Sequence, residues 1–315
     1  MVSSGHMTTR HTVAADDGTR LVAYVDGVRL CDPAAVTFVL AHGWTLDHTS
    51  WQRVTDRLTR HDAGVRVVRY DQRGHGASAT GPRGATITRL GDDLAAVVRQ
   101  LAPSGHLVLA GHSMGGMSIM AMAGRHPELV ADRVGGVALV STAASLADAD
   151  DGAFVAGAPP WLRGVAARML PWVMRALSLV PGNGRLPAGR VAGTQALLFG
   201  DAFEHGDLAD THGVISRTRA STVGAYYLAL SRHDEVEALV HLREVPTTVL
   251  VGTRDRLTPQ RYAHQIAEAL PGAHLEVYEG AGHMLPLECT DSVAAHLLDL
   301  VPATAGESAA RRRSR

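Results

Sequence analysis

Residues 107–116 constrain the fold of this chain more strongly than any other segment. They read Leu-Val-Leu-Ala-Gly-His-Ser-Met-Gly-Gly, a short buried-strand pattern that runs into a glycine-rich turn. Good helix formers follow at 117–125. A strand-to-helix turn this sharp strains the backbone of Ser113, so its flanking positions must be nearly free of side chains. The pattern predicts a nucleophile elbow that lifts the Ser113 hydroxyl above a sheet edge, with a structural turn and an incidental serine as the alternative.

Strand-like and helical patterns alternate along most of the chain. Strands separated by helices imply right-handed crossovers and a mostly parallel sheet that is covered on both faces. We therefore predict an α/β fold. The strands are expected at 21–25 (opening an edge hairpin), 37–41, 65–70, 106–110, 134–140, 247–251 and 274–278, and the helices at 51–60, 87–101, 117–125, 262–270 and 292–300.

The alternation breaks between about residues 143 and 245, which we interpret as a helical lid inserted into one α/β core. Helical stretches are expected there at 161–180 and 222–232, and Pro171 predicts two short packed helices in the first of them rather than one lipid-contacting helix. Aromatic residues are enriched in this segment, which suits either the wall of an apolar pocket or the packing of the lid itself. The expected division is a core of 1–142 and 246–302, a lid of 143–245, and a disordered basic tail of 303–315.

Composition excludes several kinds of chemistry and partner. The formal net charge of −1 gives no global field toward nucleic acid or an anionic surface. All 30 cationic residues are arginine, which excludes Schiff-base, Ser-Lys and P-loop chemistry because each needs a lysine. No dinucleotide fingerprint, His-Glu-x-x-His helix or cysteine pair occurs, so we expect neither a cofactor nor a metal. The separated Cys31 and Cys289, with no apolar leader or integral membrane segment, predict a cytoplasmic protein.

A serine hydroxyl needs a base within hydrogen-bond reach, and an acid must orient that base. Asp255 fits the acid, because it lies just past a predicted strand and before a helix start at 258–259. Its alternatives are a turn-capping aspartate or a surface ion pair with Arg254 or Arg256. His283 fits the base, on a glycine-rich loop after the last predicted strand. The chain order of serine, acid and histidine is the one expected for a strand-turn-helix nucleophile.

An oxyanion needs two main-chain donors beside the nucleophile. The N–H of Met114 directly follows Ser113, and the N–H of Trp44 follows the strand predicted at 37–41, where Gly43 tolerates a close approach. The Trp44 indole either lines a pocket or packs in the core. We expect His42 and His112 to hold loops by hydrogen bonds rather than transfer protons.

These motifs make the chain resemble the α/β-hydrolase superfamily, in its lidded lipase, esterase and C–C hydrolase-like branch. The resemblance rests on residues 42–44, 71–78, 111–116, Asp255 and 282–283, and it covers nearly the whole chain. It implies that Ser113 attacks a carbonyl carbon, His283 relays the proton and Asp255 holds the imidazole. It also implies that 71–78 is a structural loop. Related epoxide hydrolases and dehalogenases carry aspartate at the elbow, so serine here argues against both activities.

The leading hypothesis is therefore a serine hydrolase that cleaves carboxylic esters of lipophilic or small-molecule substrates through an acyl-enzyme. The same triad serves a cofactor-free perhydrolase or haloperoxidase-like activity, thioesterases, lactonases, acyltransferases and C–C hydrolases. From another class comes a non-catalytic protein that binds a ligand under the lid. Transient lipid contact through the lid stays open, as does the oligomeric state.

Overall fold

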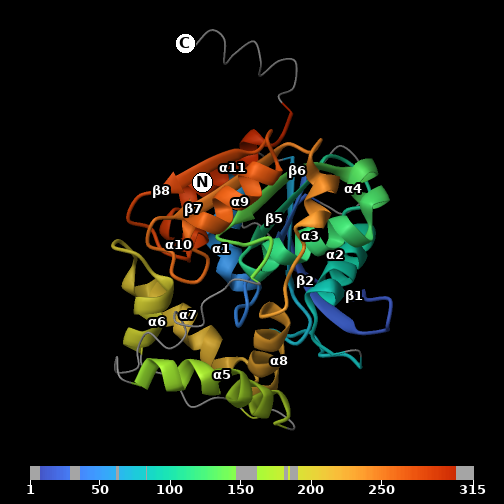
Figure 1. The fold of residues 1–315 in the computed structure, drawn as a ribbon. Coiled ribbons are helices and arrows are strands. Elements are labelled where there is room, and N and C mark those ends of the chain that lie inside the picture. Colours follow the sequence, from blue (N-terminus) through green and yellow to red (C-terminus); the bar gives the residue numbers. More distant parts are fainter. Residues whose placement is uncertain are drawn as a thin grey trace, which may run out of the picture.

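An eight-stranded sheet forms the centre of the molecule (Figure 1). The computed structural model describes residues 8–28, 36–61, 64–82, 84–146, 162–180, 184 and 191–302. Neighbouring strands follow the order β1-β2-β4-β3-β5-β6-β7-β8; β2 is antiparallel to β1 and β4, and all pairs from β4 to β8 are parallel. The predicted α/β class with a mostly parallel sheet is thus confirmed. The strands are β1 (Thr9–Ala14), β2 (Arg20–Gly27), β3 (Val36–Ala41), β4 (Val65–Asp71), β5 (Leu107–His112), β6 (Val134–Val140), β7 (Thr247–Gly252) and β8 (His274–Tyr278).

Helices cover both faces of this sheet. Successive side chains of a strand point to opposite faces, so Leu109 and Leu139 enter the apolar layer shared with α2, α3 and α9. Their neighbours Val108 and Ala138 enter the layer shared with α1 and α11. Burial on both faces explains why the strands read as aliphatic runs. The core helices are η1 (His48–Trp51), α1 (Gln52–His61), α2 (Ile87–Leu101), α3 (Met114–Arg125), α4 (Pro127–Arg133), α9 (Gln260–Ala269), α10 (Leu285–Glu288) and α11 (Thr290–Asp299).

The helical insertion lies between β6 and β7. Figure 1 shows its helices as a layer beneath the core. The following 3-10 helix η4 (Glu237–Leu242) packs Leu239 and Leu242 into the core with α3. The boundaries of the insertion at 143 and 245 remain predictions. The tail 303–315 lies outside the described residues. The lid helices are α5 (Arg163–Ser178), α6 (Val191–Leu198), α7 (His205–Arg217) and α8 (Ala220–Leu230).

Some elements of the structure differ from those predicted from the sequence. Pro171 lies inside α5, which is one continuous helix rather than two. Packing against α8 compensates for the hydrogen bond that proline removes, since Gly224 leaves room for the α5 backbone at Met174. The edge hairpin begins earlier than expected, with β1 pairing antiparallel to β2. Helices α4, α6, α7 and α10 carried no sequence signal strong enough to be predicted. No helix in the described ranges is long and apolar enough to cross a membrane.

Candidate active site

Ser113 occupies the turn between β5 and α3, as the sequence predicted. Its φ of 54° and ψ of −121° lie outside the region that residues with a side chain normally adopt. The turn is fixed on both sides: the Ser113 N–H donates to the Val140 carbonyl at 2.9 Å, and the Thr142 hydroxyl donates to the Ser113 carbonyl at 2.8 Å. Strained backbone that its surroundings hold in place is typical of functional positions.

Two glycines make this turn possible. A Cβ at Gly115 would collide with the backbone of β3 at Ala41, and one at Gly111 would collide with the first turn of α3. The β5 strand and α3 therefore approach each other and β3 more closely than any side chain permits. This close approach brings the end of β3 beside Ser113.

Asp255 and His283 form a buried hydrogen-bonded pair. The distance between Asp255 Oδ2 and His283 Nδ1 is 2.9 Å, and both residues are at most 5% exposed. Asp255 follows β7 and His283 follows β8, two parallel neighbours in the sheet, so their loops meet at its carboxyl edge. Because Nδ1 is engaged, Nε2 is the ring nitrogen left to act on a substrate or a hydroxyl.

The surroundings of Asp255 keep it ionised. Burial alone would raise its pKa, but the charge and hydrogen bond of His283 and the N–H and hydroxyl of Thr258 outweigh burial and lower it. The neighbouring arginines bind elsewhere: Arg254 contacts Asp201 at 3.3 Å, and Arg256 donates to the Ala196 carbonyl at 2.6 Å. The surface ion pair weighed as an alternative is therefore not formed. Asp255 does accept N–H groups of its own turn, in addition to holding His283.

Ser113 and His283 line the same cavity, whose volume is about 460 Å³. The lid supplies one wall and the core the other, and the Trp44 indole lies between them, 6.3 Å from the Tyr227 ring. Most of the described lining side chains are apolar, as expected for a site that holds a lipophilic group. They include Leu46, Met117, Leu146, Leu197, Ile215, Val223, Tyr227, Leu230, Leu257 and Met284.

Both expected main-chain donors lie at this cavity's end of the sheet. Met114 is the first residue of α3, so its N–H has no acceptor within the helix. Trp44 follows β3, which pairs with β5, and a Cβ at Gly43 would lie 3.0 Å from the His112 ring. The geometry is compatible with an oxyanion hole, and that role remains a prediction.

Three further histidines hold the loops around the cavity. His42 bonds the Gly43 carbonyl through Nδ1 at 2.7 Å and accepts the Gln72 N–H at 2.9 Å. His112 bonds the His283 carbonyl at 2.8 Å. Burial lowers the pKa of both, to about 3 for His112, so both are neutral. The structural role expected for these two histidines fits their contacts, and His75 supports the adjacent loop by accepting the Thr45 N–H at 3.2 Å.

The loop 71–78 is built around buried charges. Asp71 bonds His48 Nδ1 at 2.8 Å and the Ala77 N–H at 2.8 Å. Arg73 is 1% exposed and forms ion pairs with Asp17 at 2.8 Å and Asp93 at 2.7 Å. These side chains are engaged in holding the loop, as expected for a structural segment.

Sequence reasoning missed Glu288. Its carboxylate accepts the N–H groups of Gly282 at 2.9 Å, Met284 at 3.0 Å and Gly200 at 2.7 Å. The first two flank His283 and the third belongs to the lid, so Glu288 joins the histidine loop to the lid. A glutamate at the end of a four-residue helix gives no local signal of such a role.

Comparison with known proteins places the chain in a family. The sequence model of the family described as serine aminopeptidase, S33, matches residues 32–290. The chain belongs to this family of α/β-hydrolases. This confirms the superfamily inferred from the motifs and the α/β-hydrolase fold with its helical insertion.

The hydrolase is similar to proteins with several activities. It is 29% identical over 266 residues to the pimeloyl-[acyl-carrier protein] methyl ester esterase of Aromatoleum aromaticum, covering 84% of this chain and 97% of that protein. It is 26% identical to the non-heme haloperoxidase of Rhodococcus erythropolis, covering 92% and 98%. Its fold matches that of a thermophilic esterase from Thermogutta terrifontis with a TM-score of 0.72 and 24% identity, covering 92% and 97%.

Proposed function

We propose that this α/β-hydrolase cleaves carboxylic esters of small lipophilic substrates through an acyl-enzyme on Ser113. The observation that carries the proposal is the buried 2.9 Å contact between Asp255 and His283 at the wall of a cavity that Ser113 also lines. The similarity to a methyl ester esterase over most of both chains supports the same reaction class.

In the proposed mechanism, His283 Nε2 takes the Ser113 proton while Ser113 Oγ attacks the ester carbonyl carbon. The main-chain N–H groups of Met114 and Trp44 stabilise the resulting oxyanion. His283 then gives its proton to the leaving alcohol, and the C–O bond breaks. A water molecule, deprotonated by the same imidazole, hydrolyses the acyl-enzyme. Asp255 stays ionised and stabilises the imidazolium in both halves.

The cavity favours a neutral, apolar acyl group over a peptide with a free amino terminus. A site for an ammonium group needs a carboxylate or a comparable acceptor. No acidic side chain lines the cavity among the residues that the structure describes, and its charged lining residues are Arg256 and Arg261. The aminopeptidase activity in the family description therefore has no matching charge in this part of the site.

Hydrolysis of p-nitrophenyl esters of increasing acyl length tests this function. We expect turnover that increases from acetate to a medium-length acyl group and falls once the chain exceeds the cavity. Ser113→Ala should lower kcat by at least about four orders of magnitude with unchanged thermal unfolding. Alanine p-nitroanilide, which has a free amino group, serves as the comparison substrate. Faster cleavage of this amide than of any ester would contradict the proposal.

The similarity to a haloperoxidase favours one second activity, perhydrolysis, in which hydrogen peroxide replaces water at the acyl-enzyme. Peracid formed from a short carboxylic acid and peroxide would be detected by bromination of a dye. Under the leading proposal this activity is much slower than ester hydrolysis. A protein that forms peracid but hydrolyses no ester would make perhydrolysis, and not ester hydrolysis, the main activity.

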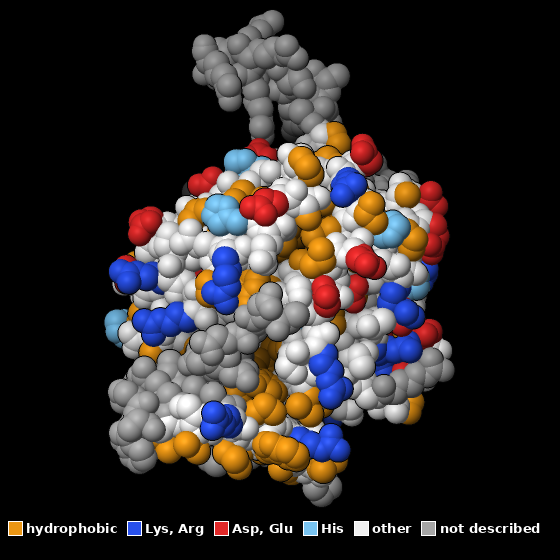
Figure 2. Space-filling view, viewed as in Figure 1, with side chains coloured by type: hydrophobic (Ala, Val, Ile, Leu, Met, Phe, Trp, Pro, Cys, Tyr) orange, Lys and Arg blue, Asp and Glu red, His pale blue; other side chains and the backbone are white. Residues whose placement is uncertain are grey.

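The lid helix α5 supports transient lipid contact as part of this proposal. Val165, Met169, Trp172 and Val173 are 48–69% exposed and share one side of the helix. Figure 2 shows hydrophobic side chains along the lower edge of the molecule, where α5 lies in Figure 1, with arginines beside them. The α5 sequence carries three arginines and no acidic residue, which favours an anionic lipid surface over a second copy of the same face.

Co-sedimentation with vesicles tests this contact. We expect binding to phosphatidylglycerol vesicles that is weaker on phosphatidylcholine and lost in Trp172→Glu. The matched control is Val240→Glu, which changes a residue that is 49% exposed on η4, the 3-10 helix that packs against α3. Equal binding by both variants, or none by the unchanged protein, would reject α5 as a lipid-contacting helix.

A cytoplasmic location also remains part of the proposal. It rests on the cysteine usage, because two cysteines so far apart in the sequence favour a reducing compartment. Cys289 is a half-buried free thiol, and Cys31 lies outside the described residues. Burial and the nearby Glu288 raise the pKa of Cys289 to about 11, so this thiol is poorly reactive. Fractionation of cells that express the protein would test the location.

A further inference from the structure

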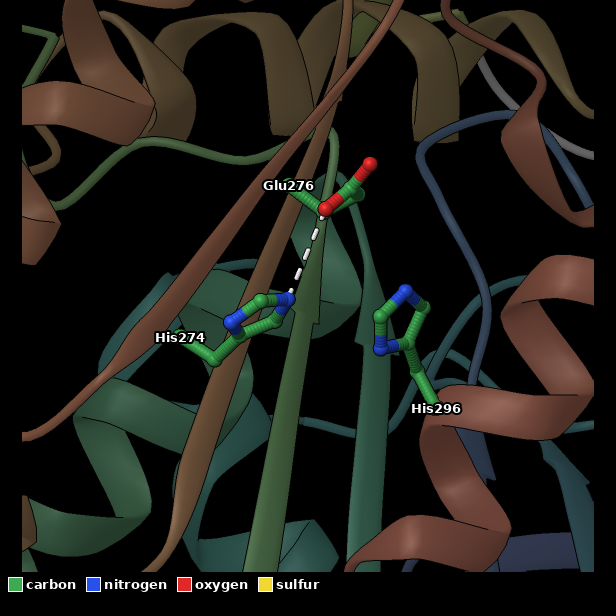
Figure 3. A group of neighbouring side chains, drawn as sticks. All are labelled: His274, Glu276 and His296. Atoms are coloured by element: carbon green, nitrogen blue, oxygen red, sulfur yellow. Dashed lines mark ion pairs between the residues drawn. The ribbon is translucent and has the colours of Figure 1, made fainter. Parts of the chain in front are cut away.

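A group of metal-ligand side chains lies where the last helix packs on the edge strand, away from the cavity. His274 and Glu276 belong to β8, and His296 belongs to α11 (Figure 3). One ligand atom from each lies within 4.8 Å of the other two. We propose that these three residues form a binding site for a zinc-like divalent cation, which fastens α11 to β8.

The backbone explains why the three side chains meet. Residues two apart on a strand share a face, so His274, Glu276 and Tyr278 point to the same side of β8. That side faces α11, because Tyr278 packs with the apolar residues of α11 while Leu275 and Val277 pack in the opposite layer. His296 lies at the margin of this contact, with its ring 6.4 Å from Tyr278 and 5.4 Å from His274.

One of the three distances already matches the separation that a bound ion requires, and the other ligand atoms lie within 4.8 Å of one another. Tetrahedral zinc with bonds of about 2.1 Å places its ligand atoms ~3.4 Å apart. His274 Nε2 and Glu276 Oε2 are 3.5 Å apart, which already suits a shared ion. Figure 3 shows a ring nitrogen of His296 facing the same space from the helix. Because His274 is exposed and Glu276 is half-buried, we expect a bound ion to draw these two side chains toward His296 by rotation about their χ angles.

The chemistry of the ligands selects the kind of ion. Two imidazoles and one carboxylate favour zinc, copper, nickel or cobalt, whereas magnesium and calcium prefer oxygen ligands alone. Asp299, one helical turn beyond His296, adds negative charge that favours a cation. Three protein ligands leave a fourth position for water.

The position in the fold indicates a stabilising role. His274 is the first residue of β8, and β8 runs parallel to β5. His274 therefore lies at the amino-terminal ends of the strands, whereas Ser113 lies at their carboxyl ends. An ion bound there cannot reach the proposed triad. It would instead link β8, the edge strand of the described sheet, to α11, the helix that covers it. Binding to the folded chain alone would then stabilise it by mass action.

Titration of the full-length protein with zinc, after treatment with a chelator, tests the site. Isothermal calorimetry should show a saturable site of 1:1 stoichiometry that magnesium does not fill. His274→Ala and His296→Ala should each weaken this binding at least about tenfold, since each removes one of three ligands. His274 is exposed, so its replacement should leave folding intact even if the His296 variant does not fold.

The matched control is His264→Ala, which removes an exposed histidine of α9. It should bind zinc as tightly as the unchanged protein, and zinc should raise Tm in both but not in His274→Ala. Zinc binding that survives in His274→Ala and His296→Ala, or that is lost equally in His264→Ala, would overturn the proposal. Ester hydrolysis should persist in chelator, so failure of the metal site and failure of the proposed function give different results.

Discussion

The main-chain N–H of His283 donates a hydrogen bond of 2.8 Å to the carbonyl oxygen of Leu198, the last residue of α6. The Asp201 N–H returns a bond of 2.8 Å to the Gly280 carbonyl. The loop that carries the proposed base is therefore attached to the lid as well as to the core. A movement of α6 away from the core would break these bonds, so we expect the position of the lid to affect the proposed proton transfer by His283.

Glu288→Gln should weaken that coupling. The amide places an NH₂ group against one of three main-chain N–H donors, which leaves a polar group unsatisfied and costs about 1–3 kcal/mol in the free energy of unfolding. Displacement of His283 should lower kcat roughly 10- to 100-fold on a p-nitrophenyl ester. Glu279→Gln is the control, because Glu279 is exposed and contacts only the Thr253 hydroxyl at 3.3 Å among the bonds described. A Glu288→Gln variant as active and stable as the control would show that the joint between loop and lid has no effect.

Asp255→Asn should abolish most activity while the fold persists. An asparagine amide cannot stabilise the imidazolium and can hold His283 in the wrong tautomer, so we expect kcat to fall by about 10³–10⁴. The measurements are kcat for hydrolysis of a p-nitrophenyl ester and the thermal unfolding of the variant. A folded variant that loses less than about tenfold in kcat would remove Asp255 from the triad.

Stability should fall as the pH decreases from about 6.5. Burial lowers the pKa of His75 and His112 to about 3, whereas these imidazoles protonate near 6.5 in the unfolded chain. Between these values the unfolded chain binds more protons than the folded protein, so acid favours unfolding by up to about 1.4 kcal/mol per pH unit for each histidine. Urea unfolding at pH 7 and pH 5 should show this slope. His75→Gln should reduce it and the exposed His264→Gln should not; an unchanged slope in His75→Gln would count against buried neutral histidines.

Arg73→Gln should be strongly destabilising. The variant leaves the carboxylates of Asp17 and Asp93 without their shared cation at a site that is 1% exposed, for an expected cost of about 3–5 kcal/mol. Arg57→Gln removes an ion pair with Asp291 whose side chains are 49% and 76% exposed, and it should cost less than about 1 kcal/mol. Chemical denaturation measures both. Similar losses in the two variants would mean that burial of the Arg73 pairs does not matter.

The sequence predicted the parts of the site that depend on local chemistry. Ser113 could be found because the strained turn requires glycine at 111 and 115, and the Cβ collisions there give the physical reason. Asp255 and His283 could be paired because the carboxyl ends of parallel strands meet at one edge. The strong aliphatic pattern likewise identified the strands of the parallel sheet.

Features built by distant segments could not be predicted in this way. Arg73 meets partners from the β1–β2 turn and from α2, and Glu288 meets a lid residue 88 positions away. Pro171 shows the reverse case, since a local helix-breaking signal is outweighed by tertiary packing against α8. Such contacts depend on the folded arrangement of the lid, which no short motif encodes.

Covalent labelling with a fluorophosphonate, followed by mass spectrometry of the peptides, tests the central claim most directly. The proposed triad predicts one adduct per chain, located on Ser113, with labelling abolished in Ser113→Ala and greatly slowed in His283→Ala. A folded protein whose Ser113 stays unmodified while it binds an apolar ester tightly would instead be a ligand-binding protein, and the hydrolytic mechanism would be wrong.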